Sequence, residues 1–291
     1  MIRRLAWVTT QEARGRDEDE ELAVTALRAA GVTVDVVDWD DPAVRWAGYE
    51  RVVLRSTWDY PQRLGAFLAW LEAVGQVTDL RNPLAMVRWN LDKHYLADLE
   101  RSGVPITPTL FLEPGDSPAF PAGEFVVKPA IGAGSRDAAS YGPDQHDSAA
   151  GHVRRLHAAG ASVLVQPLLA SVAVDGEWPL VFFGGRYSHA ASKRVALPRA
   201  GVIDDLFAEE TNAPHVAEAE QIAVAQHAVD VVAQRFGVPL YARVDLVRDD
   251  RGEPCVLEVE LVEPSLFLPQ APGAVAALVA ALQGTQGGDQ A

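Results

Sequence analysis

Hydrophobic positions in the first 80 residues fall into two patterns, short apolar runs and longer stretches with a helical period. The short runs predict strands over residues 4–10, 32–39, 51–57 and around 76–80. The longer stretches predict helices over residues 17–31 and 61–75, each of which ends at a glycine. Strands and helices that alternate at this spacing indicate a small parallel sheet with helices on its faces.

After residue 80 the pattern is less regular. The segment 81–89 (RNPLAMVRW) is predicted to be a linker, and a helix is predicted from Asn90, its N-cap, to Gly103, with Lys93 in its first turn. We then expect, in chain order, a strand over 124–129, a loop over 130–140, a helix over 146–159 and a strand over 161–169.

The remaining residues predict a mainly antiparallel unit. Its expected elements are strands over 176–185 and 186–194, a loop over 195–215, a helix over 216–237, a hairpin formed by 241–247 and 255–261, and a terminal helix over 273–284. The loop has about 20 residues, and loops of that length inside a compact domain are usually functional or mobile. The tail over 285–291 is expected to be disordered.

Charge and cysteine content narrow the class of protein. The 291 residues carry a formal net charge of −15, which argues against a nucleic-acid or anionic-membrane partner because both bind basic surfaces. The single cysteine, Cys255, excludes an internal disulfide and fits a reducing compartment. The N-terminal apolar run is too short for a signal or membrane-spanning segment. We therefore expect a soluble cytoplasmic protein.

Lysine is rare in this chain. Only Lys93, Lys128 and Lys193 stand among the 25 basic residues, and the others are arginine. A chain that uses arginine as its general surface cation retains lysine where a compact ammonium is needed, or by chance. The context of each lysine decides between these alternatives.

Carboxylates recur in the last strand of the predicted hairpin (CVLEVEL). Glu258 and Glu260 point to the same side of the strand, and cross-strand partners share a face. If Asp245 pairs with Glu258, Arg243 lies opposite Glu260, and one arginine does not neutralise three carboxylates. A hard divalent cation does, and oxygen ligands suit Mg²⁺; the alternative is an exposed polar face on an edge hairpin. Glu263 has the opposite parity and is expected in a loop, without a direct role at the metal.

A glycine loop follows the strand that carries Lys128. Gly132, Gly134 and Ser135 stand in the segment AIGAGS, where small residues let backbone N–H groups approach a phosphate. The loop matches neither G-x-x-x-x-G-K-[ST] nor G-x-G-x-x-G, and an ordinary flexible loop has a similar composition. Together, the three lysines, this loop and the carboxylate hairpin indicate a nucleoside triphosphate bound with Mg²⁺.

The order of these parts resembles the ATP-grasp carboxylate–amine ligases over residues 86–282. The resemblance rests on the segments NLDKH, VVKPAIGAGS, VLVQPLL, SHAASKR, ARVDLV and LEVE, in this order. It implies an α/β (α+β) ATP-grasp fold, in which two α+β lobes clasp ATP after a small parallel-sheet domain. The corresponding domains are a pre-ATP-grasp substrate domain (1–85), a first lobe with the glycine-loop lid (86–168) and a second lobe with the metal-binding hairpin (169–291).

The resemblance also implies roles for individual residues. Those expected to bind ATP are Lys93, Lys128, Gly132, Gly134, Ser135, Gln166, Pro167, Leu168, Glu177 and Lys193. Those expected to bind two Mg²⁺ ions, for which Mn²⁺ could substitute, are Asp245, Glu258 and Glu260. Arg243 and Lys193 are expected to be catalytic, at the phosphoryl group that is transferred. The family usually has asparagine at the position of Glu260, and a carboxylate oxygen can replace the amide oxygen.

The activity that the resemblance implies is that of an ATP-dependent ligase. A small amino-acid-like carboxylate would take the γ-phosphate to give an acyl phosphate, and a nitrogen nucleophile would then displace phosphate. The segments VRWNLDK, YSHA, ARVDLVR and LEVELVEPS further resemble a ligase of this family that closes a ring within one molecule in antibiotic biosynthesis. The alternatives are a small-molecule kinase on the same scaffold and a nucleotide-binding regulatory module without turnover. A monomer and a homodimer are both consistent with the sequence.

A polar and aromatic cluster after the third predicted strand is the candidate substrate site, because ligands bind beyond the carboxyl ends of strands in open α/β sheets. Arg55 would pair with a carboxylate and Asp59 with an amine. The alternative is a helix N-cap before Pro61 with a packed tryptophan. The residues expected to contact substrate are Arg55, Ser56, Trp58, Asp59 and Ser265.

Overall fold

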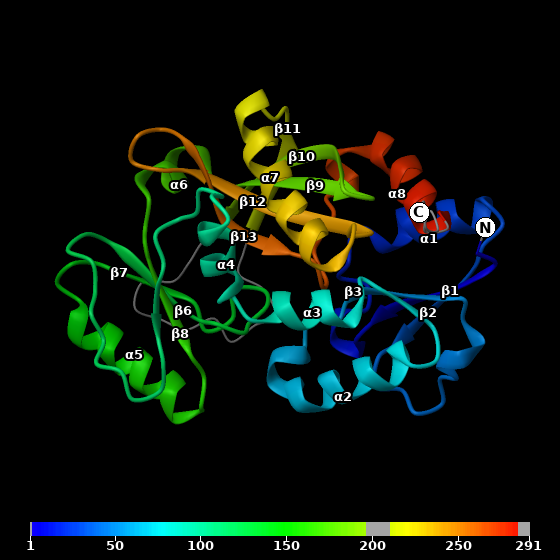
Figure 1. Ribbon diagram of the computed structural model, residues 1–291, viewed down its shortest axis with the longest axis horizontal. Helices are drawn as coiled ribbons and strands as arrows, with labels where there is room; N and C mark the ends of the chain where they lie inside the picture. Colours follow the sequence, from blue (N-terminus) through cyan, green and yellow to red (C-terminus); the bar gives the residue numbers. More distant parts are fainter. Residues whose placement is uncertain (1, 196–209, 285–291) are drawn as a thin grey trace.

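The computed structural model describes residues 2–195 and 210–284, which form three β-sheets connected by helices and loops (Figure 1). The sheets occupy residues 4–81, 110–167 and 178–260 in the chain, and the described residues also include five short 3₁₀ helices. These are η1 (Gln11–Ala13), η2 (Trp46–Gly48), η3 (Tyr60–Arg63), η4 (Leu268–Gln270) and η5 (Pro272–Ala274). The domain boundaries at 85/86 and 168/169 stay predictions.

The N-terminal sheet has the strand order β2-β1-β3-β4, and all neighbouring strands pair in parallel. Its elements are β1 (Arg4–Thr9), α1 (Glu20–Ala29), β2 (Thr33–Asp38), β3 (Arg51–Ser56), α2 (Leu64–Gly75) and β4 (Asp79–Arg81). Strand β3 is buried along its whole length because α2 packs Phe67 on one face of the sheet and α1 packs Leu27 on the other. The predicted parallel arrangement is confirmed.

A second, antiparallel sheet has the order β5-β8-β6-β7 and lies on the opposite side of the molecule from the N-terminal sheet in Figure 1. Its elements are β5 (Leu110–Leu112), β6 (Phe125–Pro129), β7 (Ala139–Tyr141), α5 (His146–Ala158) and β8 (Val163–Pro167). Helix α5 packs Val153 and Leu156 against Phe125 and Val127 of the sheet. Strands β5 and β7 were not predicted, because three residues carry too little periodicity, and β7 takes up the end of the predicted loop over 130–140.

The central sheet has the order β11-β10-β9-β12-β13, and its strands are antiparallel. Its elements are α6 (Ala170–Asp175), β9 (Trp178–Phe183), β10 (Arg186–Val195), β11 (Glu210–His215), α7 (Ala219–Phe236), β12 (Tyr241–Arg248), β13 (Pro254–Glu260) and α8 (Val275–Gln283). Helix α7 covers this sheet with Ala225, Val229 and Val232, while α8 lies beside α1 and joins the core of the N-terminal sheet (Figure 1).

The prediction for residues 81–103 is wrong in two respects. Residues 81–89 are not a linker, because α3 (Leu84–Leu91) follows Pro83 and buries Met86 and Val87. Asn90 is therefore inside a helix and is not an N-cap. The second helix, α4 (Tyr95–Arg101), begins only after Lys93, which lies between the two helices. A single continuous apolar pattern concealed this break.

The predicted loop over 195–215 is shorter than expected at both ends. Val195 belongs to β10, and residues 210–215 form β11, which pairs with β10. The rest of this loop (196–209) and the tail predicted to be disordered (285–291) lie outside the described residues. No helix within residues 2–195 and 210–284 combines the length and apolar character that crossing a bilayer requires.

Candidate active site

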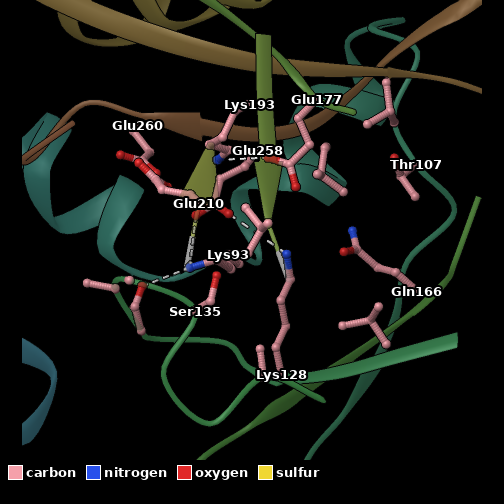
Figure 2. Close-up of a pocket in the computed structure, with 18 of the residues that line it drawn as sticks. Lys93, Thr107, Lys128, Ser135, Gln166, Glu177, Lys193, Glu210, Glu258 and Glu260 are labelled. Atoms are coloured by element: carbon pink, nitrogen blue, oxygen red, sulfur yellow. Dashed lines mark hydrogen bonds and ion pairs between the residues drawn. The ribbon is translucent and has the colours of Figure 1, made fainter. Parts of the chain in front are cut away.

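A cavity of about 440 Å³ lies where the three sheets meet, a volume typical of small-molecule sites. The N-terminal sheet contributes Trp58 and Tyr60, which follow β3. The second sheet contributes Lys128 and Gln166, and the central sheet contributes the face of β12 and β13 that carries the charged residues. Figure 2 shows Gln166 and Thr107 on one side of this cavity and Glu260 on the other.

All three lysines of the chain point into the cavity (Figure 2). The Lys93 Nζ lies 3.1 Å from the Glu258 carboxylate and also donates a hydrogen bond of 3.0 Å to the Gly132 carbonyl. The Lys128 Nζ lies 3.8 Å from the other oxygen of Glu258. The Lys193 Nζ is 3.0 Å from Asp245 and 2.7 Å from Glu177. Because all three lysines reach the same cavity, their retention by chance is a poor explanation.

The hairpin of β12 and β13 has the register that the sequence left as a condition for grouping the charges. Asp245 is paired with Glu258 and Arg243 with Glu260, and a β-bulge follows Asp245. Arg243 holds the row together, because its guanidinium lies 2.7 Å from Asp245 and 2.5 Å from Glu260. The four charged groups therefore share one face, as expected.

Burial and neighbouring opposite charges shift the pKa values of the charged cavity residues in opposite directions. Burial works to raise the pKa of Asp245, but Arg243 and Lys193 outweigh it and lower that pKa to about 2. Burial raises the pKa of Glu260 to about 7, since its one close cation is shared with Asp245. Burial lowers the pKa of Lys128, whose nearest carboxylate is distant. The site is thus a compact network of alternating charges.

The donor set fits Mg²⁺ only in part. Asp245, Glu258 and Glu260 offer carboxylate oxygens, which a hard cation prefers. Among the described residues, however, no three acidic, histidine or cysteine side chains are grouped closely enough to hold an ion by themselves. Each carboxylate instead contacts a lysine or arginine. Metal binding here would require phosphate oxygens to complete the ligand set and to draw the lysines away.

The glycine loop after β6 borders the cavity with Gly132, Gly134 and Ser135. Gly134 has φ +62° and Ser135 has φ +60°, so the loop turns through a left-handed backbone that favours glycine. A Cβ on Gly132 would lie 3.2 Å from the Pro129 ring. The loop is therefore packed closely against Pro129 at the edge of the cavity.

Strand β8 and the start of β9 form another wall. Gln166, Pro167 and Leu168, which the resemblance assigns to ATP binding, line the cavity. The Gln166 amide donates to the Thr109 hydroxyl at 2.9 Å, and the Leu168 N–H already donates to the Glu124 carbonyl. Glu177 also lines the cavity, beside Lys193 (Figure 2).

The predicted substrate residues are divided between the cavity and the interior. Trp58 and Ser265 line the cavity, whereas Arg55, Ser56 and Asp59 are not among the residues that line it. Arg55 is 1% exposed and donates a hydrogen bond of 2.7 Å to the Pro264 carbonyl, and it also stacks on buried aromatic rings.

The other two substrate candidates also have partners within the protein. The Ser56 hydroxyl is 2.7 Å from that of Thr9. Asp59 accepts a hydrogen bond from Trp39 at 2.8 Å and stands at the N-cap position of η3, where its side chain makes no capping hydrogen bond. The structure therefore brings Trp58 and Ser265, but not Arg55, Ser56 or Asp59, to the cavity.

Sequence reasoning missed several cavity residues, among them Thr107, Glu210 and Glu263. Glu263 lies in a loop, as predicted, but it is 8% exposed and lines the cavity. Burial and the nearby Glu260 raise the pKa of Glu263 to about 8. Its parity relative to Glu258 placed it on the wrong side because the strand ends at Glu260, after which alternation no longer applies.

The fold and this arrangement of charges define the class of protein. The D-alanine–D-alanine ligase from Bacillus anthracis complexed with ATP has the same fold, with a TM-score of 0.65 at 15% identity over 95% of this chain and 94% of that chain. The ATP-grasp ligase PsnB complexed with minimal precursor, Mg and ADP gives a TM-score of 0.61 at 19% identity over 95% and 97%. The predicted ATP-grasp fold is confirmed.

Nearer relatives give the particular family. The chain is 42% identical to the cycloserine biosynthesis protein DcsG of Streptomyces lavendulae over 277 residues, which are 91% of this chain and 92% of the relative. The crystal structure of D-cycloserine synthetase DcsG has a TM-score of 0.89 at 39% identity and covers 96% of this chain and 98% of that chain. Residues 5–82 match the family described as D-cycloserine synthetase DcsG, N-terminal domain. The chain belongs to this family of ATP-dependent carboxylate–amine ligases.

Proposed function

We propose that this ligase closes a ring within one amino-acid-like molecule by forming an amide bond at the expense of ATP. O-ureido-D-serine, which the D-cycloserine-forming enzyme closes, is the first candidate substrate, because the chain is 42% identical to DcsG over nearly its whole length. The observation that carries the proposal is the convergence of Lys93, Lys128 and Lys193 on the carboxylates of β12 and β13 in one cavity.

Each lysine has a distinct place along a bound triphosphate. Lys93 and Lys128 stand between the glycine loop and Glu258, and we assign them to the α- and β-phosphates. Lys193 lies next to Asp245, and we assign it to the γ-phosphate. Asp245, Glu258 and Glu260 would hold two Mg²⁺ ions, for which Mn²⁺ can substitute, and these ions would neutralise phosphate charge.

Arg243 is the residue best placed for the reaction itself. Asp245 and Glu260 hold its guanidinium from two sides, so its position is fixed before substrate arrives. In the first step a substrate carboxylate oxygen attacks the γ-phosphorus and ADP leaves. In the second step a nitrogen of the substrate attacks the acyl carbon, loses a proton and expels inorganic phosphate. Arg243 and Lys193 would stabilise the negative charge that develops on the transferred phosphoryl group.

The test is an incubation of the purified protein with ATP, Mg²⁺ and a panel of amino acids that includes O-ureido-D-serine. We expect phosphate release that depends on a carboxylate substrate, a hydroxamate when hydroxylamine is added, and a cyclic product by mass spectrometry. The Lys128→Met variant serves as the inactive control. A stable phosphorylated product without free phosphate would support the kinase alternative and contradict the proposal.

A further inference from the structure

In the part of the chain that the structure describes, one buried acidic side chain in the cavity forms no ion pair with a lysine or arginine. Glu177, Asp245, Glu258 and Glu260 are each paired with a lysine or arginine. Glu263 lines the same cavity, yet within residues 2–195 and 210–284 no ion pair joins it to a basic side chain. A buried carboxylate without a counter-charge is costly to ionise, so a ligand that carries positive charge would be bound favourably there.

The surroundings of Glu263 suit an ammonium group. The buried side chains of Trp58 and Tyr60 line the same cavity, and burial together with the nearby charge of Glu263 raises the pKa of the Tyr60 hydroxyl. A carboxylate beside aromatic side chains binds ammonium through a charge-assisted hydrogen bond and through attraction to the rings. The cavity therefore contains an unused acceptor for a cationic substrate group.

The position of Glu263 is fixed by the N-terminal sheet. The Trp58 indole N–H donates to the Glu263 carbonyl at 3.0 Å, and Arg55 donates to the Pro264 carbonyl at 2.7 Å. Both donors come from the end of β3 or the residues after it. A carboxylate whose backbone is held in this way needs little rearrangement to bind a ligand.

The same loop also reaches the residue assigned to phosphoryl transfer. Arg243 donates a hydrogen bond of 3.2 Å to the carbonyl of Ser265, two residues after Glu263, and Ser265 lines the cavity. The carboxylate and the amine of an amino acid are joined through a single carbon atom. A substrate whose carboxylate is activated near Arg243 would therefore bring its amine toward Glu263.

We infer that Glu263, together with the Tyr60 hydroxyl, binds the α-ammonium group of the substrate. The inference rests on the proposed function and adds a specificity: the substrate must carry a free, charged amine on the carbon next to the carboxylate that is activated. Glu263 is then a substrate-binding residue, separate from the three carboxylates assigned to metal.

The experiment compares O-ureido-D-serine with 3-(ureidooxy)propionate, in which hydrogen replaces the amino group. For the wild-type enzyme we expect a KM roughly ten- to hundredfold lower for the amino compound, the usual range for a charge-assisted contact. Glu263→Gln should remove this difference by raising the KM for the amino compound alone. Tyr60→Phe should reduce the difference in the same direction, and Glu253→Gln, an exposed residue outside the cavity, should leave it unchanged.

Three outcomes would overturn the inference: equal KM values for the two compounds in the wild type, unchanged discrimination in Glu263→Gln, or a loss of kcat with both compounds alike. If Glu263→Gln does not fold, the wild-type comparison alone decides. If the wild type turns over neither compound, the proposed function fails separately. Calorimetry of D-serine against 3-hydroxypropionate, with a non-hydrolysable ATP analogue and Mg²⁺, then tests the ammonium site: tighter wild-type binding of D-serine supports it, and equal affinities contradict it.

Discussion

Glu177 and Lys193 are joined twice. Their backbones exchange two hydrogen bonds of 2.8 Å each across an isolated β-bridge, and the Lys193 Nζ lies 2.7 Å from the Glu177 carboxylate. Glu177 thus fixes both the backbone and the side chain of the lysine that also contacts Asp245. The backbone bridge and the ion pair together hold the residue before β9 next to Lys193, and Lys193 in turn contacts Asp245 in the hairpin.

This relationship leads to a first prediction for Glu177→Gln. The variant keeps the backbone bridge but loses the charge that orients Lys193, so we expect the KM for ATP to rise roughly tenfold with a smaller change in kcat. Lys193→Met should instead lower kcat roughly hundredfold or more, because it removes charge stabilisation in the transition state. Steady-state kinetics with ATP as the varied substrate separate the two effects. Equal KM values for ATP in the wild type and Glu177→Gln would contradict the role of Glu177 in orienting Lys193.

The two lysines next to Glu258 should differ in their effect on stability. Lys93→Met loses an ion pair of 3.1 Å and the hydrogen bond to Gly132, and we expect a cost of about 1–3 kcal/mol in the free energy of unfolding. Lys128 lies 3.8 Å from Glu258, and burial lowers its pKa, so Lys128→Met should be neutral or slightly stabilising. Urea denaturation of the nucleotide-free variants measures this difference.

Both lysine variants should nevertheless bind ATP at least tenfold more weakly, since each loses a phosphate contact. Calorimetric titration with a non-hydrolysable ATP analogue and Mg²⁺ gives these affinities. A Lys128→Met protein that bound nucleotide as tightly as the wild type would overturn the phosphate assignment, whatever its stability.

Metal binding should depend on nucleotide. Because Asp245, Glu258 and Glu260 already contact lysine or arginine, Mg²⁺ alone should raise the melting temperature by less than about 1 °C. Mg²⁺ together with an ATP analogue should raise it by several degrees, through stabilisation by mass action. Thermal denaturation with each component alone and with both together is the measurement. A large shift with Mg²⁺ alone would show that the carboxylates form a metal site without phosphate.

The pKa of Glu263 predicts a pH dependence of stability. Burial raises this pKa to about 8 in the folded protein, well above its ordinary value, so the folded state holds a proton that the unfolded state has already released. The free energy of unfolding should therefore fall as pH rises from about 4.5 to 8, by at most about 1.4 kcal/mol per pH unit from this group. The titratable and charged groups that act on it are Tyr60, Lys93, Arg243, Glu258 and Glu260.

Urea denaturation at several pH values, in the absence of nucleotide and metal, tests this dependence. Glu263→Gln cannot ionise and should show a flatter profile between pH 5 and 8, while Glu253→Gln should follow the wild type. A wild-type stability that increased over this window, or a Glu263→Gln profile parallel to that of the wild type, would contradict the prediction.

Prediction from the sequence was most accurate where the two-residue alternation of side chains along a strand determines which residues share a face. Alternation placed Glu258 and Glu260 on one face of their strand, and the structure supplies the pairing of Asp245 with Glu258 and of Arg243 with Glu260 that the sequence left as a condition. Prediction was less accurate where a residue contacts partners that are far away in the sequence. Asn90 resembles a helix cap, yet its amide donates to the Val259 carbonyl at 2.7 Å and accepts from the Leu261 N–H. No local pattern contains such a partner.

Arg55 illustrates the same limit at the substrate site. A polar residue at the carboxyl end of a parallel strand usually faces ligand, and this expectation placed Arg55 in the cavity. Its actual partners are the carbonyl of Pro264, which is 209 residues away in the chain, and the carboxylate of Asp19 at 3.6 Å. The side chain supports the cavity wall from behind, where only the complete fold brings the two segments together.

The loop over residues 263–268 has a mechanical consequence. Trp58 and Arg55 hold its first part, and Asp19 accepts hydrogen bonds of 2.5 and 2.8 Å from the N–H groups on either side of Phe267, which has φ +53°. These hydrogen bonds tie the loop to the N-terminal sheet and to Asp19, whereas the glycine loop and β8 belong to another sheet. If Glu263 binds substrate and the glycine loop binds phosphate, as we propose, sequence changes near the N-terminal sheet would alter substrate choice, and changes in the second sheet would alter nucleotide affinity.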